Sequence, residues 1–267
     1  MRDMIRGIDH LVIACADPDT AADELSDALG LAVIGGGRHE SGGTWNRIAW
    51  LADGSYIELI GIADREAAVA SPVGAAAVRT LDASGGGLAA FALAVDDLSL
   101  TVGGLRAAGS SLSDPVHGSR RREDGELVEW WVSVPTGDLG AQSVPFLIQH
   151  AMVGAEWGHA ALAERATFVH PIGSPVVLAR VDLATDDPPT LAARYHDELG
   201  LDVWAVSDLA VCSIGRHVVR LVPAREMDAP AVVTIGAQVD APRTVDALGM
   251  RFDVERVEMP VPATPGG

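Results

Sequence analysis

The chain has 267 residues, of which 48% are hydrophobic, and its formal net charge is −18. This length and composition allow a sizeable core in one large domain or two small ones. The acidic balance argues against nucleic acid or an anionic membrane surface as a partner. No apolar stretch has the length that a membrane-spanning helix needs.

The basic residues are all arginine, because the sequence contains no lysine. Schiff-base chemistry on lysine, including the attachment of pyridoxal phosphate (PLP), is therefore excluded, and so is a P-loop. The glycine-rich stretch at 35–43 lacks the G-x-G-x-x-G spacing and precedes a predicted strand instead of a helix. We therefore expect no nucleotide cofactor.

The two cysteines, Cys15 and Cys212, lie far apart in apolar runs, and the N-terminus shows no secretory signal pattern. A disulfide framework is not expected, and a reducing cytoplasm is the predicted location.

One pattern occurs three times along the chain. Residues 8–34 predict a strand, an Asp-Pro turn, a helix with apolar positions three and four apart, and a glycine exit into another strand. The same order recurs at 88–116 and 176–206, and a shorter copy begins at 232. Further short strands follow the three helices, over 31–35, 44–51 and 55–62, over 112–117, 126–134 and 143–150, and over 201–206, 208–214 and 216–222.

Each unit is therefore βαβββ, and the fold class is α+β. Such a unit cannot bury both of its faces alone, so units should pair into curved, half-barrel mixed sheets with a concave, ligand-binding face. We predict a first domain over 1–151, a connector over 152–172 with room for a short helix, and a second, truncated domain over 173–267.

Several stretches resemble one protein family. "GIDHLVIACADPDTA", "GGGRHESGGTWNRIAWL", "SYIELIGI", "SVPFLIQHA" and "HPIG", in this order, are similar to the glyoxalase-like domain family of the vicinal oxygen chelate superfamily. The resemblance implies tandem βαβββ units and a small-molecule site on the concave sheet, often with a divalent metal. The superfamily includes glyoxalase I, extradiol dioxygenases, epimerases and antibiotic-resistance proteins, so the resemblance implies the fold more firmly than the reaction.

Two residues stand where the superfamily places metal ligands. Strand alternation puts His10 on the concave face, opposite to Leu11 and Ile13, and the resemblance implies a metal-ligand role there. A histidine hydrogen-bonded within the sheet is the alternative. Glu58 stands between apolar residues, where a carboxylate needs a metal, a cation or strong donors. The alternative for Glu58 is a salt bridge to an arginine such as Arg47.

The second unit offers no matching ligands. The position equivalent to His10 falls on alanine at 89 or 90, and the position equivalent to Glu58 falls on Phe146 or Leu147. Two protein ligands rarely hold a divalent ion tightly, which puts glyoxalase I activity in doubt. Residues from neighbouring positions are candidates to complete a site: Gln149, His150, His117 and His39.

The glycine-rich loop contributes further candidates. Its glycines allow close approach of the backbone to a ligand, and the resemblance makes the loop, with His39, Thr44 and Asn46, a recurring mark of the family. We assign His39 a catalytic role and Thr44 and Asn46 a substrate-binding role, the alternative being that they only cap the turn. Trp131 is assigned to the cavity wall and Trp130 to the core, and Gln149 is a further substrate-binding candidate.

Two functions remain open. The leading hypothesis is a cytoplasmic lyase or isomerase that acts on a small oxygenated metabolite through an enolate, with Glu58 as catalytic base. His10 and Glu58 would either hold a divalent metal (Zn, Ni, Mn or Fe) weakly or act directly as an acid/base pair. The alternative is a non-catalytic small-ligand-binding or resistance protein without metal. A monomer and a homodimer are both compatible with units that pair within one chain.

Overall fold

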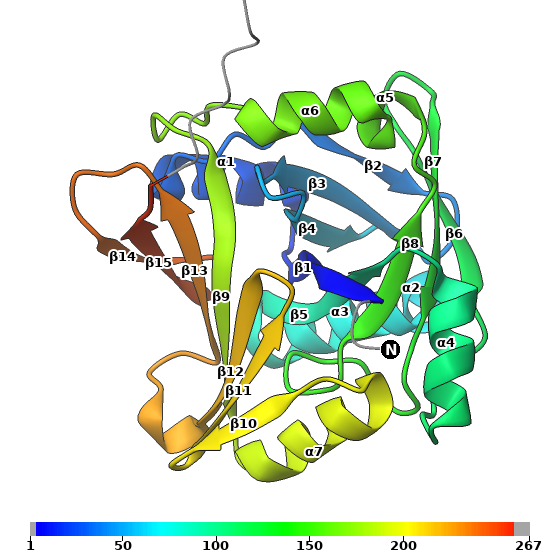
Figure 1. Ribbon diagram of the computed structural model, residues 1–267. Helices are drawn as coiled ribbons and strands as arrows, with labels where there is room; N and C mark the ends of the chain where they lie inside the picture. Colours follow the sequence, from blue (N-terminus) through cyan, green and yellow to red (C-terminus); the bar gives the residue numbers. More distant parts are fainter. Residues whose placement is uncertain (1–3, 259–267) are drawn as a thin grey trace, which may run out of the picture.

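The computed structural model describes residues 4–258 and contains a barrel that packs against a second, open sheet (Figure 1). The first βαβββ unit supplies β1 (Ile5–Ala14), α1 (Pro18–Leu29), β2 (Gly35–His39), β3 (Thr44–Trp50) and β4 (Tyr56–Ile62). The second unit supplies β5 (Gly87–Val95), α4 (Leu98–Ala107), β6 (Val116–Arg121), β7 (Leu127–Ser133) and β8 (Phe146–His150). Two helices join the units, α2 (Arg65–Val69) and α3 (Pro72–Ser84).

The two N-terminal units form a closed barrel with the strand order β1-β4-β3-β2-β6-β7-β8-β5. The paired units in mixed sheets confirm the predicted fold class, but the curvature goes further than the expected half-barrel. The closing contact is short, because β2 and β6 pair only at Arg38 with Arg121 and at His39 with Arg120. A closed barrel has an interior instead of an open concave face, so we expect the ligand site of this half inside the barrel.

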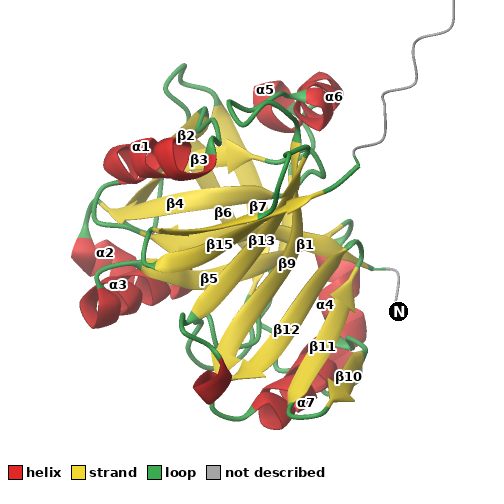
Figure 2. Ribbon diagram, turned by 90° about the vertical axis from the view of Figure 1, so that its left-hand side faces the viewer, coloured by secondary structure: helices red, strands yellow, loops and turns green. Residues whose placement is uncertain are grey.

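The C-terminal half forms a seven-stranded sheet with the order β10-β11-β12-β9-β13-β15-β14 (Figure 2). The third unit gives β9 (Val176–Thr185), α7 (Pro188–Leu199), β10 (Val203–Val206), β11 (Leu209–Ile214) and β12 (His217–Pro223), followed by the short 3₁₀ helix η1 (Ala224–Glu226). The shorter copy gives β13 (Ala231–Ala237), β14 (Arg243–Ala247) and β15 (Met250–Arg256), with no helix among its described residues. The connector holds α5 (Gly154–Trp157) and α6 (His159–Thr167).

Local sequence signals explain the repeated helix boundaries. Asp17 and Asp187 cap α1 and α7 by accepting backbone N–H bonds, a proline follows each cap, and Gly30 and Gly200 end the helices in the left-handed conformation. The strands that follow start later than predicted. The strand pairing of β2 begins at Gly35, because residues 31–34 form an irregular segment after α1, in which Leu31 is buried in the core.

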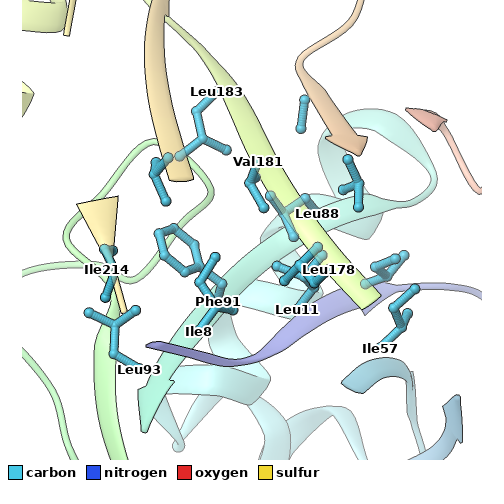
Figure 3. Close-up of a cluster of buried hydrophobic side chains, with 14 of the residues drawn as sticks. Ile8, Leu11, Ile57, Leu88, Phe91, Leu93, Leu178, Val181, Leu183 and Ile214 are labelled. Atoms are coloured by element: carbon cyan, nitrogen blue, oxygen red, sulfur yellow. The ribbon is translucent and has the colours of Figure 1, made fainter. Parts of the chain in front are cut away.

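One apolar core runs through both halves. In Figure 3, Leu11 and Phe91 of the barrel meet Leu178 and Val181 of β9. The imidazole of His217 adds a polar link, since it accepts the N–H of Ile8 at 2.8 Å. The two halves therefore share one core with no gap between them. The division into domains at 151 and 173 stays a prediction. Among the described residues, no helix combines the length and apolar character needed to cross a membrane.

The barrel closure can be tested at Gly37. A Cβ atom there would clash with the backbone carbonyl of Arg121 on β6, and the residue has a φ of +156°. We expect Gly37→Ala to lower the free energy of unfolding by about 3 kcal/mol. Urea unfolding followed by tryptophan fluorescence measures it. Gly54→Ala is the control, since its Cβ would meet nothing within 4 Å and only its φ of +91° is unfavourable. Equal losses in both variants would contradict the proposed clash.

Candidate functional site

The barrel interior contains a cavity of about 180 Å³ that is partly open to solvent. It brings together seven residues selected from the sequence: His10, His39, Thr44, Asn46, Glu58, His117 and His150. Its other walls are mainly apolar and aromatic side chains of the inward faces: Ile48, Trp50, Tyr56, Ile60, Val128, Trp130, Val132, Phe146, Ile148 and Trp157. Such a cavity, with few polar groups among apolar walls, is typical of a small-molecule site.

Glu58 lies on the inner face of β4 and is 6% exposed. Ile57 and Leu59 point outward into the shared core, as the alternation predicted. The Oε1 of Glu58 accepts a hydrogen bond from the Asn46 amide at 2.6 Å, while its Oε2 lies 3.6 Å from Nε2 of His10. Arg47 pairs instead with Asp19 and Glu123 on the outside. Glu58 is therefore not held by an arginine, and one of its oxygens faces a ring nitrogen beyond hydrogen-bond distance.

The neighbouring strands fix the orientation of the Asn46 amide. Gly37 donates its backbone N–H to the Asn46 Oδ1 at 3.0 Å, so the amide nitrogen points the other way. That nitrogen donates to Glu58 and also lies 3.4 Å from Nε2 of His39. The Nδ1 of His39 is 2.5 Å from the Thr44 hydroxyl oxygen. If Nε2 of His39 accepts from the Asn46 amide, the ring proton is on Nδ1, and Nδ1–H donates to the Thr44 hydroxyl oxygen. The hydroxyl proton of Thr44 is then free to bond a ligand.

Burial lowers the pKa of His39, although the Glu58 charge opposes this effect; the positive charges of Arg120 and His10 lower it further. His39 is thus a neutral imidazole near pH 7. A neutral ring suits a positioning or hydrogen-bonding role better than that of a cation.

A bulge in β1 adds a residue that the sequence patterns did not single out, Asp9. In the pairing of β1 with β5, Ile8 faces Leu93 and His10 faces Ala92, so Asp9 is the extra residue. The bulge lets the Asp9 and His10 side chains meet, with His10 Nδ1 at 2.7 Å from Asp9 Oδ1. The same oxygen lies 3.0 Å from Nε2 of His150 on β8. The available signal was a carboxylate directly before His10 in an otherwise apolar strand.

Burial raises the pKa of Asp9, but the charges and hydrogen bonds of His150 and His10 outweigh it and hold that pKa well below its usual range. Asp9 is thus an ionised carboxylate between two imidazoles. Ring contacts fix both histidines further. His10 stacks on Tyr56 with ring centroids 4.5 Å apart, and His150 stacks on Trp157 at 3.6 Å.

Two sequence candidates, Trp131 and Gln149, lie outside the cavity, and a third, His117, lines it without joining this cluster. Trp131 packs against the outer core, and Trp130 takes the wall position instead, so the assignment of the two tryptophans to faces was reversed. Gln149 does not line the cavity and accepts the backbone N–H of Leu98 at 2.8 Å. The side chain of His117 is half exposed and bonds Glu129 at 2.9 Å.

The charge of the buried Arg120 is locally compensated. This side chain lines the cavity, and its guanidinium donates to the carbonyl of Gly36 and to Glu156, which also pairs with Arg122. Such a pair is well satisfied and leaves little charge for a ligand anion.

The donor set does not fit a divalent metal. Among residues 4–258, no three histidine, cysteine, aspartate or glutamate side chains are arranged to hold an ion. The Asn46 amide hydrogens point at Glu58 Oε1 and His39 Nε2, so Glu58 Oε2 and His10 Nε2 are the predicted ligand atoms left without a hydrogen bond from the described residues, and two protein ligands rarely hold a divalent ion. Coordination requires free lone pairs, so we derive no step through a metal.

Comparisons with known proteins agree with this architecture. A sequence model of a protein family described as "Glyoxalase-like domain" matches residues 8–199. No curated protein matches the chain. The crystal structure of a hypothetical protein from Staphylococcus aureus superposes with a TM-score of 0.76 at 15% identity, covering 94% of this chain and 99% of that one.

Two named enzymes are also structural neighbours. A mutant of 4-hydroxymandelate synthase from Streptomyces coelicolor has a TM-score of 0.53 at 14% identity and covers 89% of this chain and 72% of its own. Methylmalonyl-CoA epimerase from Mycobacterium tuberculosis has a TM-score of 0.42 at 21% identity, over 56% of this chain and 90% of its own. At these identities the likenesses bear on the fold alone, and the predicted vicinal oxygen chelate fold is confirmed.

The lowered pKa of His39 predicts a pH effect. Below about pH 6.5 the imidazole of His39 binds a proton in the unfolded chain, but its lowered pKa disfavours protonation in the fold. Protonation therefore favours the unfolded state, and the free energy of unfolding falls as the pH drops below this value. We expect wild type to lose more stability than His39→Gln between pH 7 and pH 5. Urea midpoints at both pH values measure this. Parallel losses in the two proteins would show that His39 titrates normally in the fold.

The metal fit can be tested at Asn46. We expect one equivalent of Zn²⁺, Ni²⁺ or Mn²⁺ to leave the Tm of wild type unchanged. Asn46→Asp replaces the amide donor by a carboxylate beside Glu58 and His39, so we expect Zn²⁺ to raise its Tm by several degrees. Thermal scans with and without chelator measure both. A metal-dependent rise in wild type would overturn the conclusion that the donor set does not fit.

Proposed function

The chain belongs to the glyoxalase-like domain family, and on that premise we propose that it is a small-molecule enzyme, a lyase or isomerase that removes a proton beside a carbonyl group. One observation carries the proposal. Glu58 is buried in the cavity with Oε1 held by Asn46, while Oε2 has no hydrogen bond from the described residues and lies 3.6 Å from the Nε2 of His10. A carboxylate fixed by one oxygen and open at the other is suited to act as a positioned base.

The reaction needs three roles. Glu58 Oε2 takes the proton from a carbon beside the carbonyl, and the electron pair moves to the carbonyl oxygen to give an enolate. The Thr44 hydroxyl, oriented by His39, is the candidate donor to that oxygen. Return of the proton to the opposite face of the same carbon gives an isomer, whereas loss of a leaving group from the next carbon gives a lyase product.

His10 assists Glu58. Its Nδ1 faces the Asp9 carboxylate and its Nε2 faces Glu58, so the ring is held in the position to receive or return the proton. The proposed ligand is a small oxygenated metabolite, and the two buried, free cysteines suit the expected cytoplasm.

A second candidate is a non-catalytic binding protein of the same fold. The aromatic walls of the cavity, among them Tyr56, Trp130, Phe146 and Trp157, favour it, because such walls can hold an apolar ligand without chemistry. Glu58 would then only anchor Asn46 and the surrounding strands.

Solvent exchange separates the two functions. We expect wild type to accelerate the exchange of protons beside the carbonyl in at least one of hydroxyacetone, acetophenone and 2-hydroxyacetophenone, dissolved in D₂O and followed by ¹H NMR. Glu58→Gln should slow this exchange by about 100-fold or more. Glu226→Gln is the matched control, since this glutamate is exposed in η1 of the C-terminal half and does not line the cavity.

A rate in Glu58→Gln equal to that of wild type would reject Glu58 as the base. No acceleration of any of the three ketones by wild type would favour the binding protein. Thermal scans of both variants confirm that they are folded.

A further inference from the structure

Tyr56 lines the cavity from β4, and the proposed reaction does not use its hydroxyl group. This hydroxyl makes no hydrogen bond to the residues that the structure describes. The fully buried side-chain atoms without a partner, among those residues, are His150 Nδ1, Arg165 Nη1 and Thr234 Oγ1. The Tyr56 oxygen is not one of them, so it keeps accessible surface although its side chain is mostly buried.

The surroundings of Tyr56 show that this surface belongs to the cavity. The Tyr56 ring is stacked on that of His10, and its centroid lies 4.9 Å from that of Trp50 and 6.1 Å from that of Trp157. All four side chains line the cavity. Aromatic walls cannot replace a hydrogen bond, so a ligand atom that accepts the hydroxyl proton would be stabilised at this place.

The phenol of Tyr56 is a donor at neutral pH. Burial raises its pKa, and the negative charges of Asp9 and Glu58 raise it further, against the opposing effect of Arg120. The group therefore carries its proton at pH 7, whatever the charge of the neighbouring histidines. A phenolate formed in a reaction step would also regain a proton readily.

The strand register places Tyr56 and Thr44 on opposite sides of Glu58. Thr44 pairs with Ile62 at one end of β4, Tyr56 is the first residue at the other end, and Glu58 lies between them. Tyr56 and Glu58 project from the same face, about 7 Å apart along the strand. A substrate whose carbonyl oxygen meets Thr44 and whose acidic carbon meets Glu58 therefore extends its next carbon toward Tyr56.

We propose that Tyr56 is a further catalytic residue, the general acid that protonates an oxygen leaving from this next carbon. The inference rests on the proposed function and names its substrate class, a β-hydroxy carbonyl compound. The reaction is then the loss of water, so the lyase is chosen over the isomerase.

The atoms and electrons of the step balance. Glu58 takes the proton from the carbon beside the carbonyl, and the electron pair forms the enolate. The pair then returns to make a carbon–carbon double bond while the carbon–oxygen bond on the next carbon breaks. The departing hydroxyl takes the Tyr56 proton and leaves as water. Glu58 gives up its proton and the Tyr56 phenolate regains one through water, which restores the site.

Two matched compounds test the inference on the whole protein at pH 7. 4-Hydroxybutan-2-one and 4-acetoxybutan-2-one give the same enone, but acetate leaves as a stable anion and needs no proton. We expect wild type to accelerate the loss of water, over the uncatalysed reaction, by a factor at least about ten times larger than for the loss of acetate. ¹H NMR of the enone measures both reactions.

A variant assigns the acid role to Tyr56. Tyr56→Phe keeps the ring on His10 and removes the hydroxyl, so we expect about 100-fold slower loss of water but less than about threefold slower loss of acetate. Glu58→Gln should slow both reactions, because both need the base. The matched control is Tyr195→Phe, which removes the hydroxyl of a buried tyrosine that does not line the cavity and should keep both rates.

Three results would overturn the inference: no accelerated loss of water by wild type, equal acceleration of the two compounds, or an equal effect of Tyr56→Phe on both. The first two are measured on wild type and stand even if the variant does not fold. Proton exchange by wild type without loss of water would reject this inference and leave the proposed function standing. Failure of the proposed function appears instead as unchanged exchange in Glu58→Gln.

Discussion

The hydrogen bond from the Asn46 amide to the Glu58 carboxylate is the interaction on which the barrel interior depends. Its two partners come from β3 and β4, and the amide is oriented by the backbone of Gly37 on β2. Three neighbouring strands must therefore keep one register, since a slip of one residue would turn every side chain of a strand to its other face. Burying the Glu58 carboxylate without hydrogen bonds would be costly. The carboxylate obtains its hydrogen bond only when these strands are correctly paired, so the fold and the site form together.

The bulge in β1 complements this arrangement from the other side of the cavity. A regular strand would point Asp9 away from His10, and the extra residue brings Asp9 into contact with both His10 and His150. The interior then contains two carboxylates with different surroundings. Asp9 is held between two imidazoles and acts as a fixed acceptor, whereas Glu58 has one oxygen open. Different environments for two carboxylates are the usual means of separating an orienting role from a reacting one.

The units, caps and inward positions of His10 and Glu58 could be predicted because their signals are local: an Asp-Pro start, a glycine exit and strand alternation. The closure of the barrel could not, because it depends on two residue pairs between β2 and β6, which belong to different units. The sequence patterns also gave no sign of α3, whose buried face consists of small residues such as Ala76 and Ala77.

The site was recoverable from the sequence only in part, for the same physical reason. Alternation separated Trp130 from Trp131 correctly, but which face of a curved sheet becomes the interior is decided by long-range pairing, and Trp130 faces inward. Asp9 escaped because a bulge changes the strand period by one residue, and no local pattern marks where it falls. The hydrogen-bond partner of Glu58 also depends on strand register. The pairing of β3 with β4 places Asn46 beside Glu58, whereas charge alone had suggested an arginine.

The C-terminal half shows what the same unit becomes without a site. His10 lies seven residues before the cap of α1, Asp17, and Arg180 lies seven residues before the cap of α7, Asp187. The parallel registers are also equivalent, since Val12 faces Glu58 and Asp182 faces Arg220. At the positions of the acid/base pair the third unit therefore carries two arginines, and both pair with Asp182, at 3.1 Å for Arg180 and 2.6 Å for Arg220. Glu255 lies 3.5 Å from Arg180, so two carboxylates compensate the two arginines around the buried Asp182. The other face of β9 supplies Leu178 and Val181 to the shared core. The repeated unit thus serves two purposes in one chain: the closed pair contains the cavity with Glu58, and the open pair compensates its charges and supports the barrel.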